Sequence, residues 1–128
     1  VDKVFGEPPA KGDAFFIRVG GILFACNPRE CKGPPAHLEV RLRGFSLRAT
    51  LPVRSWLVGR EGRGELLLHV NGDEGRRATF EVSSERPLLA NVEPKERAKI
   101  EPLRKGVRIT VEHAPGGCDL RIAFKPGL

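Results

Sequence analysis

ELLLHVNGDEGRRATFEVS, residues 65–83, shows the clearest alternation of apolar and polar side chains in the sequence. Each half places apolar side chains at every second position, and these are Leu66, Leu68 and Val70, then Ala78, Phe80 and Val82. Successive side chains of a strand point to opposite faces, so each half is predicted to be a β-strand with one apolar face. Between them, 71–75 supplies the Asn and Gly residues that accept a positive φ. The pattern predicts a β-hairpin covered by a second layer.

The same alternation recurs on both sides of this stretch. Two apolar runs, 15–19 and 22–26, meet across Gly20-Gly21 and predict a hairpin, with Phe15, Ile17, Val19, Ile22, Phe24 and Cys26 expected to face the core. From 37 to 53 the apolar positions change parity at Gly44, which predicts a β-bulge or a bend where the strand passes between sheets. Residues 107–112 and 120–125, joined by 114–117, predict a third hairpin.

The remaining segments are short. Residues 56–58 predict a further strand, and 87–91 and 98–101 predict pieces that Pro94 and Pro102 confine to sheet edges, unless 96–99 forms a helical turn. Residues 1–13 are interpreted as a flexible N-terminal arm. The sequence therefore predicts a single all-β domain over 1–128, an antiparallel β-sandwich of jelly-roll or Ig-like type with eight to nine strands. A closed barrel is the alternative.

The composition fits one soluble domain of 128 residues with 40% hydrophobic content. No apolar run approaches the roughly 20 residues that a membrane helix needs, so no transmembrane segment is predicted. The chain has no Met or Tyr and eleven Pro, a bias typical of thermophile proteins that high genomic GC content would also produce. An extracytoplasmic location is slightly favoured over a cytoplasmic one, because a disulfide would need an oxidising compartment.

The three cysteines allow several arrangements. Cys26 and Cys31 are close enough in sequence for a disulfide, which leaves Cys118 buried, free, or bridged to either of them. A zinc site could use Cys26, Cys31 and His37 with Cys118 or His113, although the spacing is looser than in zinc fingers. Asn71, Asp73 and Glu74 could ligate calcium in their turn, but the turn has fewer carboxylates than an EF-hand and is otherwise a solvated loop.

The net charge of +6 permits binding to phosphates or acidic polymers. A candidate basic stripe consists of Arg41, Arg43, Arg48, Arg108 and Arg121. Ordinary cross-strand pairing with Glu39, Glu81 and Glu112 would explain the same arginines. Nucleic acid is not favoured, because a single-strand binding sheet needs exposed aromatic rings and most Phe residues have core parity.

Catalysis is not predicted, because no nucleophile elbow, P-loop or dinucleotide fingerprint occurs and the histidines at 37, 69 and 113 are isolated on strands. No cofactor is expected apart from the calcium considered above. The sequence therefore favours a noncatalytic module that binds a protein partner or a second copy of itself, with Phe16 and Leu23 as the self-association surface. A basic module for nucleic acid or another polyanion is the alternative, followed by a small metal-binding domain.

Overall fold

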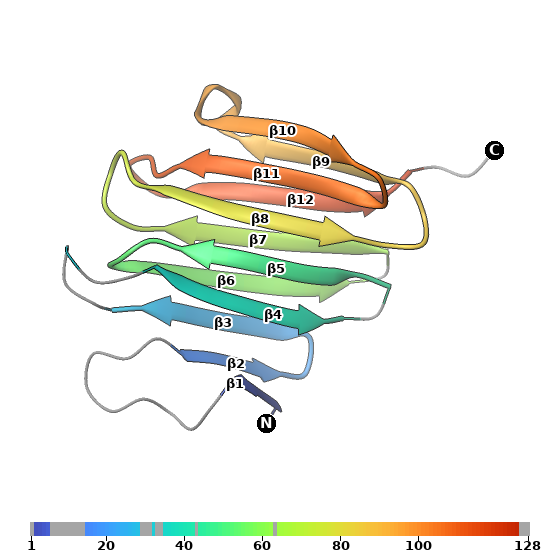
Figure 1. Ribbon diagram of the computed structural model, residues 1–128, viewed down its shortest axis with the longest axis horizontal. Coiled ribbons are helices and arrows are strands. Elements are labelled where there is room, and N and C mark those ends of the chain that lie inside the picture. Colours follow the sequence, from blue (N-terminus) through green and yellow to red (C-terminus); the bar gives the residue numbers. More distant parts are fainter. Residues whose placement is uncertain are drawn as a thin grey trace.

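The computed structural model describes residues 2–5, 15–28, 32, 35–42, 44–62 and 64–125. These residues form two antiparallel β-sheets, stacked face to face in Figure 1. Sheet A has the strand order β2-β3-β6-β7-β12-β9, with the short β1 added beside β2, and sheet B has the order β10-β11-β8-β5-β4. The predicted antiparallel β-sandwich is confirmed, with more strands than the eight or nine expected.

The strand bounds locate each segment of the sequence in these sheets. Sheet A contains β1 (Asp2–Phe5), β2 (Phe15–Val19), β3 (Ile22–Asn27), β6 (Ser55–Gly62), β7 (Glu65–Asn71), β9 (Leu88–Glu93) and β12 (Cys118–Phe124). Sheet B contains β4 (Ala36–Arg41), β5 (Ser46–Leu51), β8 (Arg77–Ser83), β10 (Ala98–Leu103) and β11 (Gly106–Glu112). One turn of 3-10 helix, η1, spans Lys95–Arg97. No helix in the described part of the chain has the length and apolar character to cross a membrane.

The core lies between the inner faces of the two sheets. Phe80 is the largest fully buried side chain, and its cross-strand neighbours in sheet B are Ala49 of β5 and Ile109 of β11. Leu66 and Leu68 of β7 are buried on the opposing sheet. The apolar sets predicted for 38–53, 66–70, 78–82 and 107–111 are all buried. The period-two alternation therefore identified the inner face of these strands correctly.

The predicted hairpin over 65–83 is wrong in its pairing. β7 pairs with β6 and β12 in sheet A, whereas β8 pairs with β5 and β11 in sheet B. The connection 72–76 crosses from one sheet to the other, and the two apolar faces meet across the core. The predicted hairpin over 107–125 is wrong in the same way, because β11 lies in sheet B and β12 in sheet A. Alternation shows that a strand has one buried face, but not which strand lies beside it.

Gly44 does not form a bulge or a passage between sheets. It has a φ of +79° between β4 and β5, which pair with each other in antiparallel register within sheet B. The amide of Leu42 donates a hydrogen bond of 2.8 Å to the carbonyl of Phe45, which closes the turn. The change of parity at Gly44 is therefore the signature of a hairpin turn that keeps both strands facing the core.

The first hairpin pairs as predicted across Gly20-Gly21 but faces the other way. Leu23 and Ala25 are buried, while Ile22 and Phe24 are exposed. Both faces of this hairpin are apolar, so alternation alone could not choose between them. Leu23 lies opposite Gly59 of β6, where the missing side chain leaves room for it in the core.

The edge strands agree with the prediction from proline. β10, which contains Pro102, is the last strand of sheet B, and β9, which ends before Pro94, is the last strand of sheet A. A proline at an edge costs no ladder hydrogen bond when its nitrogen faces solvent. In the predicted N-terminal arm, residues 2–5 form β1 on the opposite edge of sheet A, and residues 6–13 lie outside the described residues.

Candidate functional site

The outer face of sheet A carries most of the exposed apolar surface of the described chain. Six large apolar side chains that are 38–53% exposed lie on β2, β3, β6 and β7, and together they are called the apolar face: Val19, Ile22, Phe24, Trp56, Val58 and Leu67. By register, Val19 pairs with Ile22 and Phe24 pairs with Val58. Arg60 lies between Ile22 and Leu67, and Trp56 stands two residues before Val58 at the start of β6. Single exposed apolar residues are ordinary, but a patch on neighbouring strands indicates a binding surface.

Charged groups border the apolar face on its β7–β12 side. Nδ1 of His69 lies 2.7 Å from Oδ1 of Asp119, and Arg121 makes a 2.8 Å ion pair with Glu65. A shallow hollow of about 560 Å³ lies here, lined in part by Val58 and Leu67. The surface thus combines apolar side chains, and Arg60 between Ile22 and Leu67, with a polar rim on its β7–β12 side, a mixture that occurs in protein interfaces.

The predicted self-association residues are only partly placed by the structure. Leu23 has no exposed surface, so it cannot contact a partner and that prediction is wrong. The side chain of Phe16 lies outside the described residues. The hairpin does present apolar side chains to solvent, but they are Val19, Ile22 and Phe24, at the alternate positions to those predicted.

The outer face of sheet B is organised differently, as a ladder of alternating charges. Cross-strand register places one residue from each of five strands in a row, in the order Glu39, Arg48, Glu81, Arg108 and Glu101. Arg108 donates two hydrogen bonds of 3.0 and 3.1 Å to Oε2 of Glu81, and Arg48 lies 3.5 Å from Glu39. Opposite charges on facing positions stabilise a sheet, so these arginines pair within the sheet.

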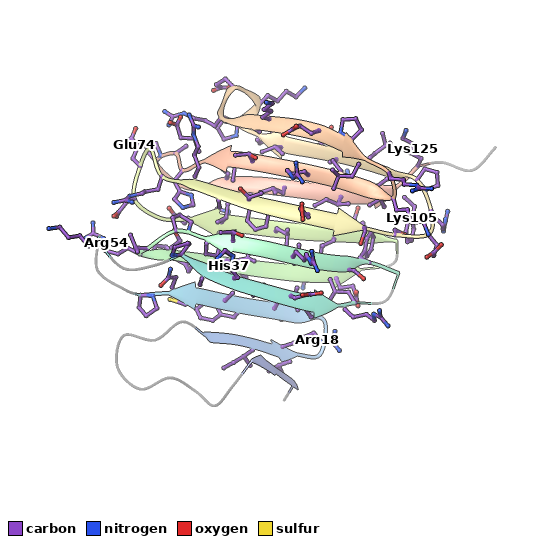
Figure 2. The ribbon with its side chains drawn as sticks, in the orientation of Figure 1. Arg18, His37, Arg54, Glu74, Lys105 and Lys125 are labelled. Carbon is purple, nitrogen blue, oxygen red and sulfur yellow. The ribbon has the colours of Figure 1, made fainter. Side chains whose placement is uncertain are left out.

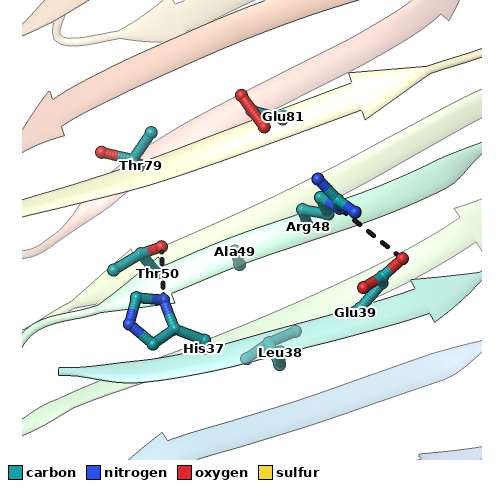
Figure 3. A pocket seen from close by; sticks show the side chains of 8 residues that line it. All are labelled: His37, Leu38, Glu39, Arg48, Ala49, Thr50, Thr79 and Glu81. Carbon is teal, nitrogen blue, oxygen red and sulfur yellow. Dashed lines mark hydrogen bonds and ion pairs between the residues drawn. The ribbon is translucent and has the colours of Figure 1, made fainter.

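A second hollow of about 480 Å³ lies over this ladder and is shown in Figure 3. Besides the charged residues, it is lined by His37, whose Nδ1 lies 3.2 Å from Oγ1 of Thr50, and by Thr79. Its two glutamates and single arginine give it no excess of positive charge. This surface therefore does not suit a polyanion.

The predicted basic stripe is not one surface. Arg48 and Arg108 lie in the ladder on sheet B, whereas Arg121 lies on sheet A beside Glu65. Arg41 is at the end of β4, where its carbonyl accepts a 2.8 Å hydrogen bond from Arg18, and Arg43 lies outside the described residues. The stripe prediction is wrong, and the cross-strand alternative is confirmed for Glu39 and Glu81.

The cysteines Cys26 and Cys118 carry free thiols, so the alternative bridge between them is wrong. Cys31 lies outside the described residues, but the free thiols of Cys26 and Cys118 mean that neither is bridged to it, so the predicted Cys26–Cys31 disulfide is wrong. Burial raises the pKa of both described thiols, which disfavours the reactive thiolate. Cys118 instead donates a 3.4 Å hydrogen bond to the carbonyl of Glu112.

The proposed metal ligands are engaged with other groups. Asp73 forms an ion pair of 2.7 Å with Arg54, Glu74 lies 3.8 Å from Arg97, and Oδ1 of Asn71 accepts a hydrogen bond from Gly72. Hydrogen bonding from Arg54 lowers the pKa of Asp73. Among the described residues, no three His, Cys, Asp or Glu side chains are grouped so that they could hold a metal ion. The described residues therefore give no support for a calcium site at 71–74 or for a zinc site at the described cysteines and histidines.

A buried polar pair that the sequence analysis missed joins the two sheets. Nε2 of His113, after β11, lies 2.9 Å from Oγ of Ser55 in β6, and neither residue has exposed surface. The backbone of His113 bonds to the amide of Gly75 and the carbonyl of Arg76, so it also anchors the 72–76 crossing. The signal was present, because His113 continues the inward parity of β11. A Ser–His pair without access to solvent holds the fold and reaches no substrate.

Burial also lowers the pKa of His113 below its ordinary value of 6.5, and the carboxylate of Asp73 only partly opposes this. Below about pH 6.5 the unfolded chain therefore takes up a proton that the folded chain resists. We expect the midpoint of thermal unfolding to fall as the pH is lowered from about 7.5 to about 5.5. The fall should be smaller in His113→Gln than in the wild type. In His37→Gln, an exposed control, it should equal that of the wild type. Equal pH profiles for all three proteins would contradict the role of buried His113 in this pH dependence.

The comparisons with known proteins concern the fold. No protein-family model matches the chain, and no characterised protein matches it in sequence. Its structure is similar to crystal structures of the catalytic module of a family 98 glycoside hydrolase from Streptococcus pneumoniae TIGR4. The complex with the LewisY pentasaccharide gives a TM-score of 0.70 and the native form 0.69, each at 14% identity. The match covers 88% of this chain and 29% of that chain, so the sandwich corresponds to less than a third of those modules.

Proposed function

We propose that this chain is a noncatalytic β-sandwich module that binds a second copy of itself through the apolar face of sheet A. The observation that carries the proposal is the placement of Val19, Ile22, Phe24, Trp56, Val58 and Leu67 on four neighbouring strands. Removing apolar surface from water is worth about 25 cal/mol per Å². A face that carries a Trp and a Phe therefore gains free energy when it is covered.

The distribution of charge favours a second copy as the partner. Arg60 and Arg121 flank Leu67 on one row of the sheet, and Asp119 and Glu93 lie on the next row. Two copies related by a two-fold axis bring the same face together in opposite directions, so unlike charges of the two rows can face each other beside the apolar side chains.

The proposal that the module is noncatalytic is supported by the state of its carboxylates. Glycoside hydrolysis generally uses two carboxyl groups across the scissile bond, one of them with a raised pKa. Here Asp73, Glu65 and Glu81 are held by arginines, and Asp73 has a lowered pKa. The likeness to part of a family 98 glycoside hydrolase at 14% identity supports the sandwich fold.

The expected result is a concentration-dependent dimer that depends on Trp56. Trp56→Glu replaces the largest side chain of the apolar face with a charge and should weaken dimerisation at least about thirtyfold. Ile100→Glu is the matched control, because Ile100 is 44% exposed, close to the 41% of Trp56, but lies on an edge strand of sheet B. Sedimentation equilibrium of the three proteins gives the association constants, with circular dichroism to confirm folding.

A wild-type protein that stays monomeric up to about 1 mM would overturn the proposal, since even weak specific dimers form at that concentration. Equal loss of dimer in Trp56→Glu and Ile100→Glu would assign the association to another surface. Retention of the dimer in Trp56→Glu would have the same meaning.

A further inference from the structure

We propose that the loop end of the sandwich opposite Arg54 and Glu74 binds an acidic polysaccharide through a cluster of cationic side chains. This inference goes beyond the dimerisation of the apolar face and uses a different part of the molecule. The cluster consists of Arg41, Arg86, Arg104, Lys105 and Lys125 and is called the basic end. Figure 2 shows Lys105 and Lys125 at one end of the sandwich, and Arg54 and Glu74 at the other.

Two adjoining hollows at the basic end provide the space for a ligand. One, of about 470 Å³, is lined by Arg41, Arg86 and Lys105, among others. The other, of about 310 Å³, adds Arg104 and Lys125. The hollows share Ser84, Glu85, Arg86 and Lys105, so they form a continuous surface. Five cationic side chains and one carboxylate line it.

The cations of the basic end lack strong carboxylate partners, unlike five arginines in other parts of the chain. Arg48, Arg54, Arg97, Arg108 and Arg121 all form ion pairs elsewhere in the chain. Arg41, Arg104 and Lys125, in contrast, have no carboxylate within 4.0 Å among the described residues.

Lys105 is paired only with Glu85, at 4.0 Å and with both side chains largely exposed, a contact that contributes little. Positive charge without internal partners attracts anions from solution most strongly where it is concentrated in a hollow.

Arg86 is the donor of the cluster whose guanidinium stacks on an aromatic ring. Its guanidinium lies 4.2 Å above the ring of Phe124, which stacks on Phe45 with centroids 4.9 Å apart. Its amide donates a 3.2 Å hydrogen bond to Oγ of Ser84, which shapes the loop. Stacking fixes the guanidinium plane but leaves its edge free, and that edge binds sulfate or carboxylate oxygens in a bidentate manner.

The same contacts argue against nucleic acid as the ligand. Proteins that hold single strands stack bases on open aromatic faces. At the basic end, the lining aromatic residues are Phe45 and Phe124, which stack on each other, and Arg86 covers Phe124. A hollow with charged rims and no open ring suits sugar units that carry sulfate or carboxylate groups.

The test measures binding of a labelled heparin-derived oligosaccharide by fluorescence anisotropy at low salt. Wild type should bind, with affinity falling steeply as salt is added, and Arg104→Gln/Lys125→Gln should bind about tenfold more weakly. The control Arg77→Gln/Lys99→Gln removes the same charge from exposed positions outside the hollows and should change affinity less than about twofold. Neither double variant alters a buried residue, so both should fold.

Two further probes define the ligand class. An oligogalacturonate carries only carboxylates, so binding to it as well as to heparin assigns recognition to anionic groups in general, and binding to heparin alone assigns it to sulfate. Absence of binding to both saccharides at low salt would overturn the proposal. An equal loss of affinity for heparin in the control variant would also overturn it. Single-stranded DNA that binds as tightly as heparin, with the same dependence on Arg104 and Lys125, would overturn it as well.

Discussion

Phe80→Ala is expected to lower the free energy of unfolding by about 3–5 kcal/mol. Phe80 has no exposed surface, and its ring lies over Ala49 and beside Ile109 in sheet B. A phenylalanine removed from a close-packed core leaves a cavity that its neighbours fill only in part. Because Ala49 is too small to move into that space, the loss should fall in the upper part of the range.

A denaturant titration measures this effect directly. Thr79→Ala, one residue earlier on the outward face of β8, is the control and should cost less than about 1 kcal/mol. A cost for Phe80→Ala that is as small as the control would mean that β8 faces the other way, and the packing of both sheets would have to be reassigned.

Gly106→Ala is expected to be nearly as damaging, for a different reason. A Cβ at position 106 would meet the carbonyl oxygen of Val82, the carbonyl carbon of Val82 at 2.9 Å and Cα of Ser83 at 2.8 Å. All three are backbone atoms of the adjacent strand β8, so no side chain can rotate away. Overpacking usually costs about 1–3 kcal/mol, and we expect the upper end or more, because β11 and β8 must separate.

Gly62→Ala provides the matched control for this substitution. A Cβ there would meet only Cγ of Glu65, at 3.9 Å, which is ordinary van der Waals contact. Its effect should stay within about 0.5 kcal/mol in the same titration. If both variants behaved alike, the close approach of β11 to β8 would be disproved.

The inner faces of the strands were predictable from sequence, whereas the strand pairing was not. Alternation gave the correct buried sets in β4, β5, β7, β8 and β11, because burial imposes a period of two on any half-buried strand. Strand neighbours depend on distances that alternation does not encode. Neighbouring strands lie about 4.8 Å apart and stacked sheets about 10 Å apart. Connection length does not encode strand neighbours either, because the three residues 52–54 cross from β5 in sheet B to β6 in sheet A, whereas the four residues 42–45 join β4 and β5 within sheet B.

The surfaces show the same limit. The arginines of sheet B could be read from sequence either as a polyanion stripe or as partners of glutamates. Only the register, which puts Glu81 between Arg48 and Arg108, decides for pairing. The apolar face was hidden for a related reason. It depends on the outward orientation of Phe24 and Trp56, and the doubly apolar first hairpin gave no signal for the orientation of Phe24.

The basic end could not be predicted because its members are far apart in sequence. Arg41 ends β4, Arg86 and Arg104 lie in the connections beside other strands, and Lys125 follows β12. The antiparallel topology brings these strand ends together. No run of like charges marks the site in the sequence, so the net charge of +6 appeared to be spread evenly.

Whether two copies cover the apolar face is tested by acrylamide quenching of Trp56 fluorescence as a function of protein concentration. Trp56 is the only tryptophan of the chain and lies 41% exposed on the apolar face. If two copies cover this face, quenching must decrease as concentration rises, along the same curve as dimer formation in sedimentation equilibrium. A quenching constant that stays the same from the monomer to the highest concentration would contradict dimerisation through the apolar face, because that face would then remain open to solvent.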